Sequence, residues 1–203
     1  MSLIRAKCAY KLKILVVGGL NSGKTTFCSK LSTYSSGKVF RKSIGVDIFV
    51  IDTFKSEDCM ITYSCWNVSP KKRFEFYKSA IFRGAVAALV LFDLTDNQSF
   101  IEAGEWIKSI KDFFDDIPII LIGNKVDLKE NRVIDYETAE EFAKKNELIG
   151  YIEISAKENI NLENSLKILN EIVYNRLKKK EKEVKKLSDN EIKQQFKDLK
   201  LKN

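Results

Sequence analysis

The chain has 203 residues, of which 44% are hydrophobic and 31% charged, so it suits one α/β domain with a filled core. No run of about 18 apolar residues occurs, which excludes a membrane-spanning helix, and no signal-peptide pattern opens the chain, so we do not expect secretion. There is no histidine and there are four scattered cysteines. This excludes the usual His/Cys zinc sites, and we expect buried free thiols in a reducing cytoplasm.

The formal net charge is +7, and most of it lies at the C-terminal end. Residues 178–203 contain ten lysines and five acidic residues, which gives +5. The remainder of the chain is therefore close to neutral. No basic face is implied outside this tail, so we expect no nucleic-acid binding.

Strand and helix patterns alternate from residue 11 to about residue 175, which favours a mostly parallel sheet with helices on both faces. Residues 46–54 and 58–66 are β-rich runs around a polar turn and predict an antiparallel hairpin. The result is an α/β fold with a six-stranded, mostly parallel sheet and one antiparallel edge strand. The other strands are predicted at 11–17, 85–92, 117–122 and 150–154, and the helices at 24–33, 98–113, 136–146 and 162–180.

The segment 18–25 (GGLNSGKT) follows the first strand, precedes the first helix and fits the phosphate-loop pattern GxxxxGK[ST]. Glycines allow successive backbone N–H groups to surround a polyphosphate, and the helix presents its positive end to it. Lys24 is expected to reach the β- and γ-phosphates, and the Thr25 hydroxyl to bind Mg²⁺. The predicted phosphate-binding residues are Gly18, Leu20, Asn21, Ser22, Gly23, Lys24, Thr25 and Thr26.

Two further motifs follow predicted strands, at the sheet edge where ligands bind. They are residues 124–127 (NKVD) and 155–157 (SAK), and they resemble the guanine-reading motifs of Ras-like GTPases. A carboxylate at Asp127 can accept from two guanine donors that adenine lacks, which gives discrimination of about 10⁴. The residues assigned to the base pocket by this resemblance are Asn124, Lys125, Asp127, Ser155, Ala156 and Lys157. Within it, Lys125 would lie along the base, the Ala156 N–H would donate to the guanine carbonyl, and Asn124 and Ser155 would tie the loops together.

The resemblance is to the Rab branch and covers nearly all of residues 10–177. Residues 43–47 (SIGVD) are similar to the switch I segment, and Trp66, Arg73-Phe74 and Arg83-Gly84-Ala85 match the family's frame around switch II. It implies a P-loop NTPase G domain that binds GTP or GDP with Mg²⁺ and acts as a regulatory switch in membrane trafficking. Protein effectors or regulators would bind through switch I and switch II.

The second switch departs from the family pattern WDTAGQE at three positions. Asn67 replaces the aspartate that holds Mg²⁺ through a water, which removes a negative charge. Pro70 replaces a glycine whose N–H contacts the γ-phosphate, and proline has no N–H. Lys71 replaces the catalytic glutamine, and lysine has no acceptor to hold a water. The candidate metal-binding residues are thus Thr25, Ser43 and Asn67, and the candidate catalytic residues are Lys24 and Lys71.

Leu20 is a further departure, since this loop position is usually small in the family and a large side chain would crowd the hydrolytic centre. We therefore favour slow or absent intrinsic hydrolysis, dependent on a partner. Two functions stay open: a cycling regulatory GTPase, or a non-cycling pseudo-GTPase that serves as a binding module.

The termini complete the expected organisation, with an N-terminal extension at 1–9, the G domain at 10–177 and a Lys/Glu-rich tail at 178–203. The tail is either a solvent-exposed continuation of the last helix or disordered. The last cysteine is Cys65, so we expect no C-terminal prenylation. The interleaved acidic residues weaken attraction to anionic lipid, and we expect a cytoplasmic protein with at most transient membrane contact.

Overall fold

The computed structural model describes the backbone of residues 8–34, 39–42, 45–56, 59–68 and 77–200. Seven strands form one sheet in the order β2-β3-β4-β1-β5-β6-β7. The pairs β2–β3 and β3–β4 are antiparallel and the others are parallel. The strands are β1 Cys8–Gly18, β2 Val39–Lys42, β3 Val46–Ser56, β4 Cys59–Val68, β5 Ala85–Asp93, β6 Ile119–Asn124 and β7 Gly150–Glu153.

All six strands expected from the sequence are present, and the β3–β4 hairpin is antiparallel as predicted. The structure adds β2, which pairs antiparallel to β3 at the sheet edge. Its four residues, VFRK, are too few to show an alternating pattern, so the sequence did not reveal it.

The helices are α1 Lys24–Tyr34, α2 Lys78–Phe82, α3 Asn97–Lys111, α4 Tyr136–Lys145 and α5 Leu162–Lys200, with a 3₁₀ turn, η2, at Lys129–Asn131. Side-chain caps fix the starts of two of them. Asp96 accepts from the Gln98 N–H at 2.9 Å before α3, and Asp135 accepts from the Thr138 N–H at 2.7 Å before α4. Each cap satisfies a backbone N–H that the helix leaves free at its first turn.

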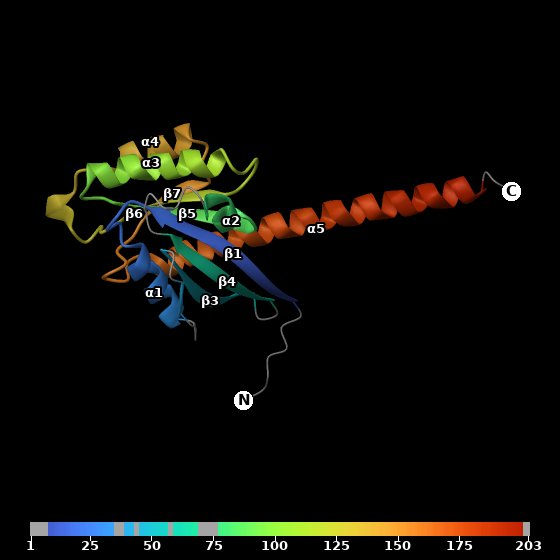
Figure 1. Cartoon of the computed structure of the whole chain (residues 1–203), viewed down its shortest axis with the longest axis horizontal. Coiled ribbons are helices and arrows are strands. Elements are labelled where there is room, and N and C mark those ends of the chain that lie inside the picture. The colour runs from blue at the N-terminus through green and yellow to red at the C-terminus, as the bar shows by residue number, and fades with distance from the viewer. Residues whose placement is uncertain (1–7, 35–38, 43–44, 57–58, 69–76, 201–203) are drawn as a thin grey trace, which may run out of the picture.

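Helices cover both faces of the sheet (Figure 1), and an apolar core lies on each side of it. Side chains of α1 and α5 pack on one face, around Phe27 and Leu169. Those of α2, α3 and α4 pack on the other, around Phe82 and Ile107. The central strand β5 is buried over Ala87–Asp93 because it is covered on both sides. This layering holds the carboxyl ends of the parallel strands in fixed relative positions.

Helix α5 continues well beyond residue 180, where the sequence pattern places its end, and projects from the body of the molecule (Figure 1). Contacts to β1 hold the first part of the extension. The Tyr10 hydroxyl donates to Glu181 Oε1 at 2.8 Å, and the Tyr10 and Tyr174 rings meet edge to face with centroids 6.4 Å apart. The side chains that α5 directs at the sheet therefore include residues beyond the expected domain limit at residue 177.

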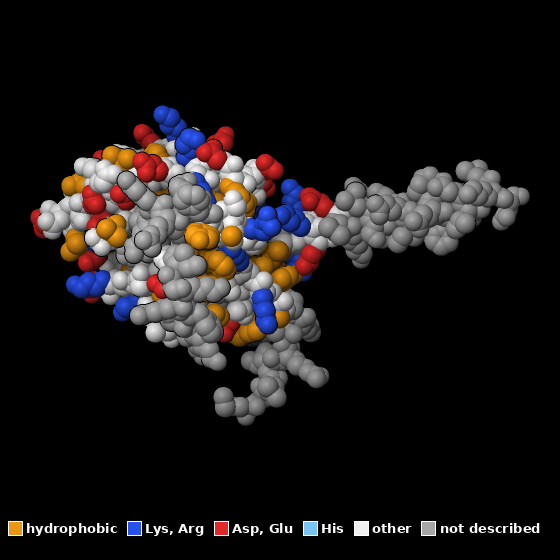
Figure 2. Space-filling model, viewed as in Figure 1, with side chains coloured by type: hydrophobic (Ala, Val, Ile, Leu, Met, Phe, Trp, Pro, Cys, Tyr) orange, Lys and Arg blue, Asp and Glu red, His pale blue; other side chains and the backbone are white. Residues whose placement is uncertain are grey.

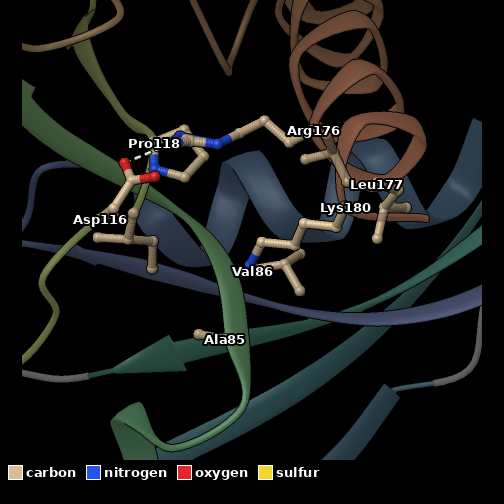
Figure 3. A pocket seen from close by; sticks show the side chains of 9 residues that line it. Ala85, Val86, Asp116, Pro118, Arg176, Leu177 and Lys180 are labelled. Carbon is tan, nitrogen blue, oxygen red and sulfur yellow. Dashed lines mark hydrogen bonds and ion pairs between the residues drawn. The ribbon is translucent and has the colours of Figure 1, made fainter. Parts of the chain in front are cut away.

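A cavity of about 90 Å³ lies beneath α5, beside the first residues of β5 (Figure 3). Val86, Pro118 and Leu177 line it, and Arg176 pairs with Asp116 at its rim. Because β5 begins here, the cavity lies at the amino ends of the parallel strands. It is therefore separate from the edge at which the predicted motifs lie.

The surface carries interspersed acidic and basic side chains on the described part of the face in Figure 2. Among the described helices, none combines the length and the apolar character that crossing a bilayer requires.

The expectation of free thiols is wrong for one cysteine. Cys28 and Cys65 are buried free thiols, and burial raises the pKa of each well above its ordinary value. Cys59 is instead disulfide-bonded. It lies on β4 directly opposite Cys8 of β1. The sequence did not indicate this disulfide, because Cys59 belongs to no CxxC pair or other local cysteine spacing.

The Tyr63 side chain is fully buried, and its hydroxyl has no hydrogen-bond partner among the described residues. Removing an unsatisfied buried hydroxyl relieves a desolvation cost, so Tyr63→Phe should raise the free energy of unfolding by about 1 kcal/mol. Tyr151→Phe is the matched control, because the Tyr151 hydroxyl donates to Glu153 Oε1 at 2.7 Å. It should lower the free energy of unfolding by about 1 kcal/mol. Urea denaturation measures both, and a clear loss of stability in Tyr63→Phe would contradict the assignment.

Candidate functional site

The three predicted motifs meet at one edge of the sheet, where β1, β6 and β7 end. A cavity of about 460 Å³ lies over the phosphate loop, and an adjoining cavity of about 220 Å³ lies between the other two loops. Gly23, Thr26 and Lys125 line both cavities. The two therefore form one continuous site with a phosphate-loop end and an NKVD/SAK end.

Gly23 closes the phosphate loop against the NKVD segment. Its φ of +89° lies in the region that favours glycine, and a Cβ there would lie 2.0 Å from Asn124 Nδ2. A larger residue would therefore push the two loops apart. Glycine is therefore required at position 23 for two reasons, the close approach to Asn124 and the positive φ of the turn.

The Lys24 ammonium lies inside the loop, on an almost fully buried side chain. It donates to Gly18 O at 3.0 Å, Gly19 O at 2.5 Å and Ser22 Oγ at 3.3 Å. Burial lowers the Lys24 pKa to about 8, and the negative charge of Glu102 acts in the opposite direction. An anion that binds in the cavity would pair with the Lys24 ammonium and so favour its charged form.

Four of the other predicted phosphate-binding residues, Leu20, Asn21, Thr25 and Thr26, line the larger cavity. Gly18 and the buried Ser22 do not line it. Asn21 adopts a left-handed conformation with φ +60°, which asparagine tolerates better than most residues. Leu20 is 66% exposed, so its side chain points away from the core. The cavity is lined by Leu20, Asn21, Gly23, Lys24, Thr25, Thr26 and Lys125.

The candidate metal position brings Thr25 and Asn67 together. Asn67 Nδ2 donates to Thr25 Oγ1 at 3.0 Å, and Asn67 Oδ1 is buried with no partner among the described residues. A free amide oxygen beside a hydroxyl suits a hydrated Mg²⁺, which prefers oxygen ligands. No cluster of three or more His, Cys, Asp or Glu side chains suited to a metal occurs in the described part of the chain.

Asn124 joins the phosphate loop to the SAK loop. Its Nδ2 donates to Ser22 O at 2.8 Å, and its Oδ1 accepts from the Ala156 N–H at 2.9 Å. The side chain is buried, so both bonds are shielded from water. The structure thus places Asn124 between the loops, as the sequence suggested. The Ala156 N–H donates to Asn124, whereas the resemblance assigned this N–H to the guanine carbonyl.

Asp127 and Lys125 lie in the smaller cavity. Asp127 Oδ1 is buried without a hydrogen-bond partner within the described ranges. Lys125 has a φ of +70° and its ammonium pairs with Asp93. Burial alone would raise the Asp93 pKa, but hydrogen bonds from Lys125 and Thr95 bring it below the ordinary value. Lys125 is therefore held along the wall of the cavity by an ionised partner.

The SAK loop closes the other side of this cavity. Ser155 Oγ accepts from the Glu158 N–H at 3.0 Å, so it fixes its own turn. Lys157 also lines the cavity, but 80% of its side chain is exposed. Of the three residues, Ser155 and Ala156 are the buried ones.

Sequence reasoning missed three residues that organise the site. Asp93 at the end of β5 is the charged partner of Lys125. Glu102 on α3 accepts from the Leu20 N–H at 3.2 Å. Glu153 accepts from Arg132, which connects the segment after NKVD to the strand before SAK. Each contact joins distant positions in the chain, so no local pattern indicated it.

Several expectations fall on residues outside the described ranges. These are the metal assignment for Ser43, the lost N–H at Pro70, the role of Lys71 and the packing of Phe74. Trp66 is described: it is half-buried, and Lys13 Nζ lies 3.6 Å from its ring centroid.

Comparison with known proteins gives one consistent result. A profile of the Ras family matches residues 13–175. The Ras-related protein Rab-3C of Bos taurus is 30% identical over 171 residues, which cover 83% of this chain and 74% of that protein. Rab11B of Nicotiana tabacum is 32% identical over 80% of this chain and 75% of its own length. RABD2a of Arabidopsis thaliana is 33% identical, with coverage of 83% and 82%.

Replacing Asn124 by Ala should lower the free energy of unfolding by roughly 2–4 kcal/mol, because Ser22 O and the Ala156 N–H both lose a buried partner. Asn131→Ala is the matched control, since Asn131 is exposed on η2. It should change stability by less than about 0.5 kcal/mol. Equal effects of the two changes in urea denaturation would show that Asn124 does not hold the loops.

Proposed function

This chain belongs to the Ras family as a Rab-like small GTPase, and we propose that it binds GTP and GDP with Mg²⁺ at the two adjoining cavities, with slow intrinsic hydrolysis. Family membership makes it a small GTP-binding regulatory protein. The assignment of individual residues and the rate of hydrolysis are the proposal.

The buried Asp127 Oδ1, unpartnered among the described residues, is the observation that carries the nucleotide assignment. Leaving a buried carboxylate oxygen without a donor costs about 1–3 kcal/mol or more. Guanine supplies two donors, N1–H and the exocyclic amine, on one edge of the ring. Adenine supplies no such pair, so guanine nucleotides are the ligands that satisfy this residue.

Phosphate binding is assigned to the larger cavity. Lys24 lies at its base with its ammonium on the loop carbonyls, and the loop N–H groups and the start of α1 add positive potential. The loss of hydration that lowers the Lys24 pKa makes an anionic ligand more favourable there. The two cavities share a wall, so one nucleotide can occupy both.

Mg²⁺ fits beside Thr25, with Asn67 Oδ1 as the acceptor for a metal-bound water. When bound, Mg²⁺ neutralises charge on the β- and γ-phosphates. Both protein oxygens are neutral, so most of the metal affinity must come from the phosphates. Weak retention of Mg²⁺ in the GDP state follows from this.

Slow hydrolysis is supported by the chemistry of the second switch. Lysine at position 71 cannot accept a hydrogen bond from an attacking water, and proline at position 70 cannot donate to the γ-phosphate. Rates in the family already depend on partners for about 10⁵-fold acceleration. A partner that supplies a water-positioning group would make the chain a cycling switch, and without one it would serve as a nucleotide-loaded binding module.

The same proposal covers partners and location. Effectors or regulators would bind at switch I and switch II, around the half-buried Trp66. The G domain would comprise residues 10–177. The tail at 178–203 would make at most transient contact with an anionic membrane from the cytoplasm, because its acidic residues offset half of its lysines.

Asp127→Asn tests the base pocket. The change should weaken GDP binding by at least about 100-fold, since one guanine donor loses its charged acceptor, without any gain for ADP. Isothermal titration of the nucleotide-free protein with GDP and ADP measures this. Asp115→Asn on the exposed α3–β6 loop is the control and should leave GDP affinity unchanged. Wild-type affinity for GDP in Asp127→Asn would disprove the pocket.

Asn67→Asp tests the metal position, because it restores the negative charge that the second switch lacks. The Mg²⁺ concentration that halves the rate of GDP dissociation should fall by about tenfold, as expected for a charged ligand on a divalent ion. Single-turnover release of γ-phosphate should stay slow in both proteins, since residues 70 and 71 are unchanged. Release by the unassisted wild-type chain at the ordinary intrinsic rate of the family would overturn the slow-hydrolysis proposal.

A further inference from the structure

We infer that Glu102 of α3 is a positioning residue for the phosphate loop: it fixes the peptide between Gly19 and Leu20 and so holds Lys24 in place for the β-phosphate. The inference rests on the proposed nucleotide function. It adds a residue that lies outside the loop, 82 positions from Leu20 in the chain.

The peptide unit between Gly19 and Leu20 is held from both sides. On the α3 side, its N–H donates to Glu102 Oε2 at 3.2 Å. On the inner side, its carbonyl accepts from Lys24 Nζ at 2.5 Å and from Ser22 Oγ at 2.9 Å. In a trans peptide the N–H and C=O point in opposite directions. A rotation of this unit would therefore break the contacts on both sides together.

Gly19 is small enough for the carboxylate to approach. A Cβ on Gly19 would lie 2.4 Å from Glu102 Oε2 and 3.1 Å from Ser99 Oγ. Ser99 is itself fixed, because its hydroxyl accepts from the Asp93 N–H at 3.0 Å. The first turns of α3 thus pack directly against the second residue of the loop, and Glu102 extends from that packed surface.

The charge of Glu102 also acts on Lys24. It opposes the effect of burial on the Lys24 pKa. Lys125 lines the same cavity from the β6 side. A carboxylate bound to the loop N–H therefore stabilises both the position and the charge of the lysine.

This arrangement predicts an effect that depends on the β-phosphate. Lys24 would contact the β-phosphate of GDP, and GMP has no β-phosphate. Losing the Glu102 contact should weaken GDP binding about tenfold, the value expected for one hydrogen bond to a charged group, and leave GMP binding unchanged. A general loss of folding would weaken both nucleotides alike.

Four variants separate the alternatives. Glu102→Ala removes the acceptor, and Glu102→Asp keeps the charge but is too short by one methylene. Glu102→Gln keeps an acceptor at the same reach and should retain GDP affinity within about threefold of wild type. Glu105→Ala, an exposed glutamate on the same helix, controls for the loss of charge from α3 and should behave as wild type.

The measurements are titration calorimetry with GDP and with GMP, and the ³¹P chemical shift of the β-phosphate of bound GDP. Glu102→Ala and Glu102→Asp should each lose GDP affinity selectively and shift the β-phosphate resonance, whereas Glu102→Gln should not. Wild-type GDP binding in both Ala and Asp variants, or equal loss for GDP and GMP, would overturn the inference. Failure of the wild-type chain to bind either nucleotide would instead refute the proposed function. If Glu102→Ala does not fold, the comparison of Asp with Gln decides the question.

Discussion

The two hydrogen bonds made by the Asn124 side chain are the constraint on which the site depends. One amide joins the carbonyl of Ser22 to the N–H of Ala156, so three loops that follow three different strands have a single common anchor. The close approach of Gly23 to the same amide leaves no room for the loops to shift independently. The sheet sets where the loops begin, and Asn124 sets how they face one another. Because this anchor is buried, it contributes to ordering Lys24, Asp127 and the SAK loop relative to each other.

Binding and switching have separate physical requirements, and the chain meets them unequally. The features to which we assign nucleotide binding are held by contacts: the phosphate loop packs against α3, and Lys125 pairs with Asp93. The features that would report the γ-phosphate depend on the second switch, where charge and backbone donors have been exchanged for an amide, a proline and a lysine. A protein with these features would hold its guanine nucleotide firmly and hydrolyse GTP slowly. Whether such a protein carries GTP or GDP would then depend on nucleotide exchange and on partner proteins more than on its own hydrolysis.

Much of this could be predicted from the sequence, and the remainder has an identifiable cause. The apolar strands and the phosphate loop are local patterns, so their order and type followed directly from the residues. The Asn124 bridge was also foreseen, because its motif fixes a role. Contacts such as Glu102 with Leu20, or Lys125 with Asp93, depend on packing between distant elements and carry no local signal. The disulfide at Cys59 has no local signal in the sequence, and β2 is too short for a periodic pattern. The sequence left the tail open as a continuation of the last helix or as a disordered segment, because a run of lysine and glutamate is compatible with both, and α5 has the helical form.

Helix α5 gives the molecule a lever. A helix rises about 1.5 Å per residue, so the part of α5 after Glu181 extends about 28 Å beyond its contact with Tyr10. A rotation of α5 by about 10° around Tyr174, where it meets Tyr10, would move the tip by about 7 Å, since the 26 residues from there to Lys200 span about 39 Å. A small change in the angle between the sheet and α5 would thus become a larger displacement at the end of this helix. A partner bound at the tip of α5 would therefore respond to the orientation of the domain rather than to the side chains on its surface.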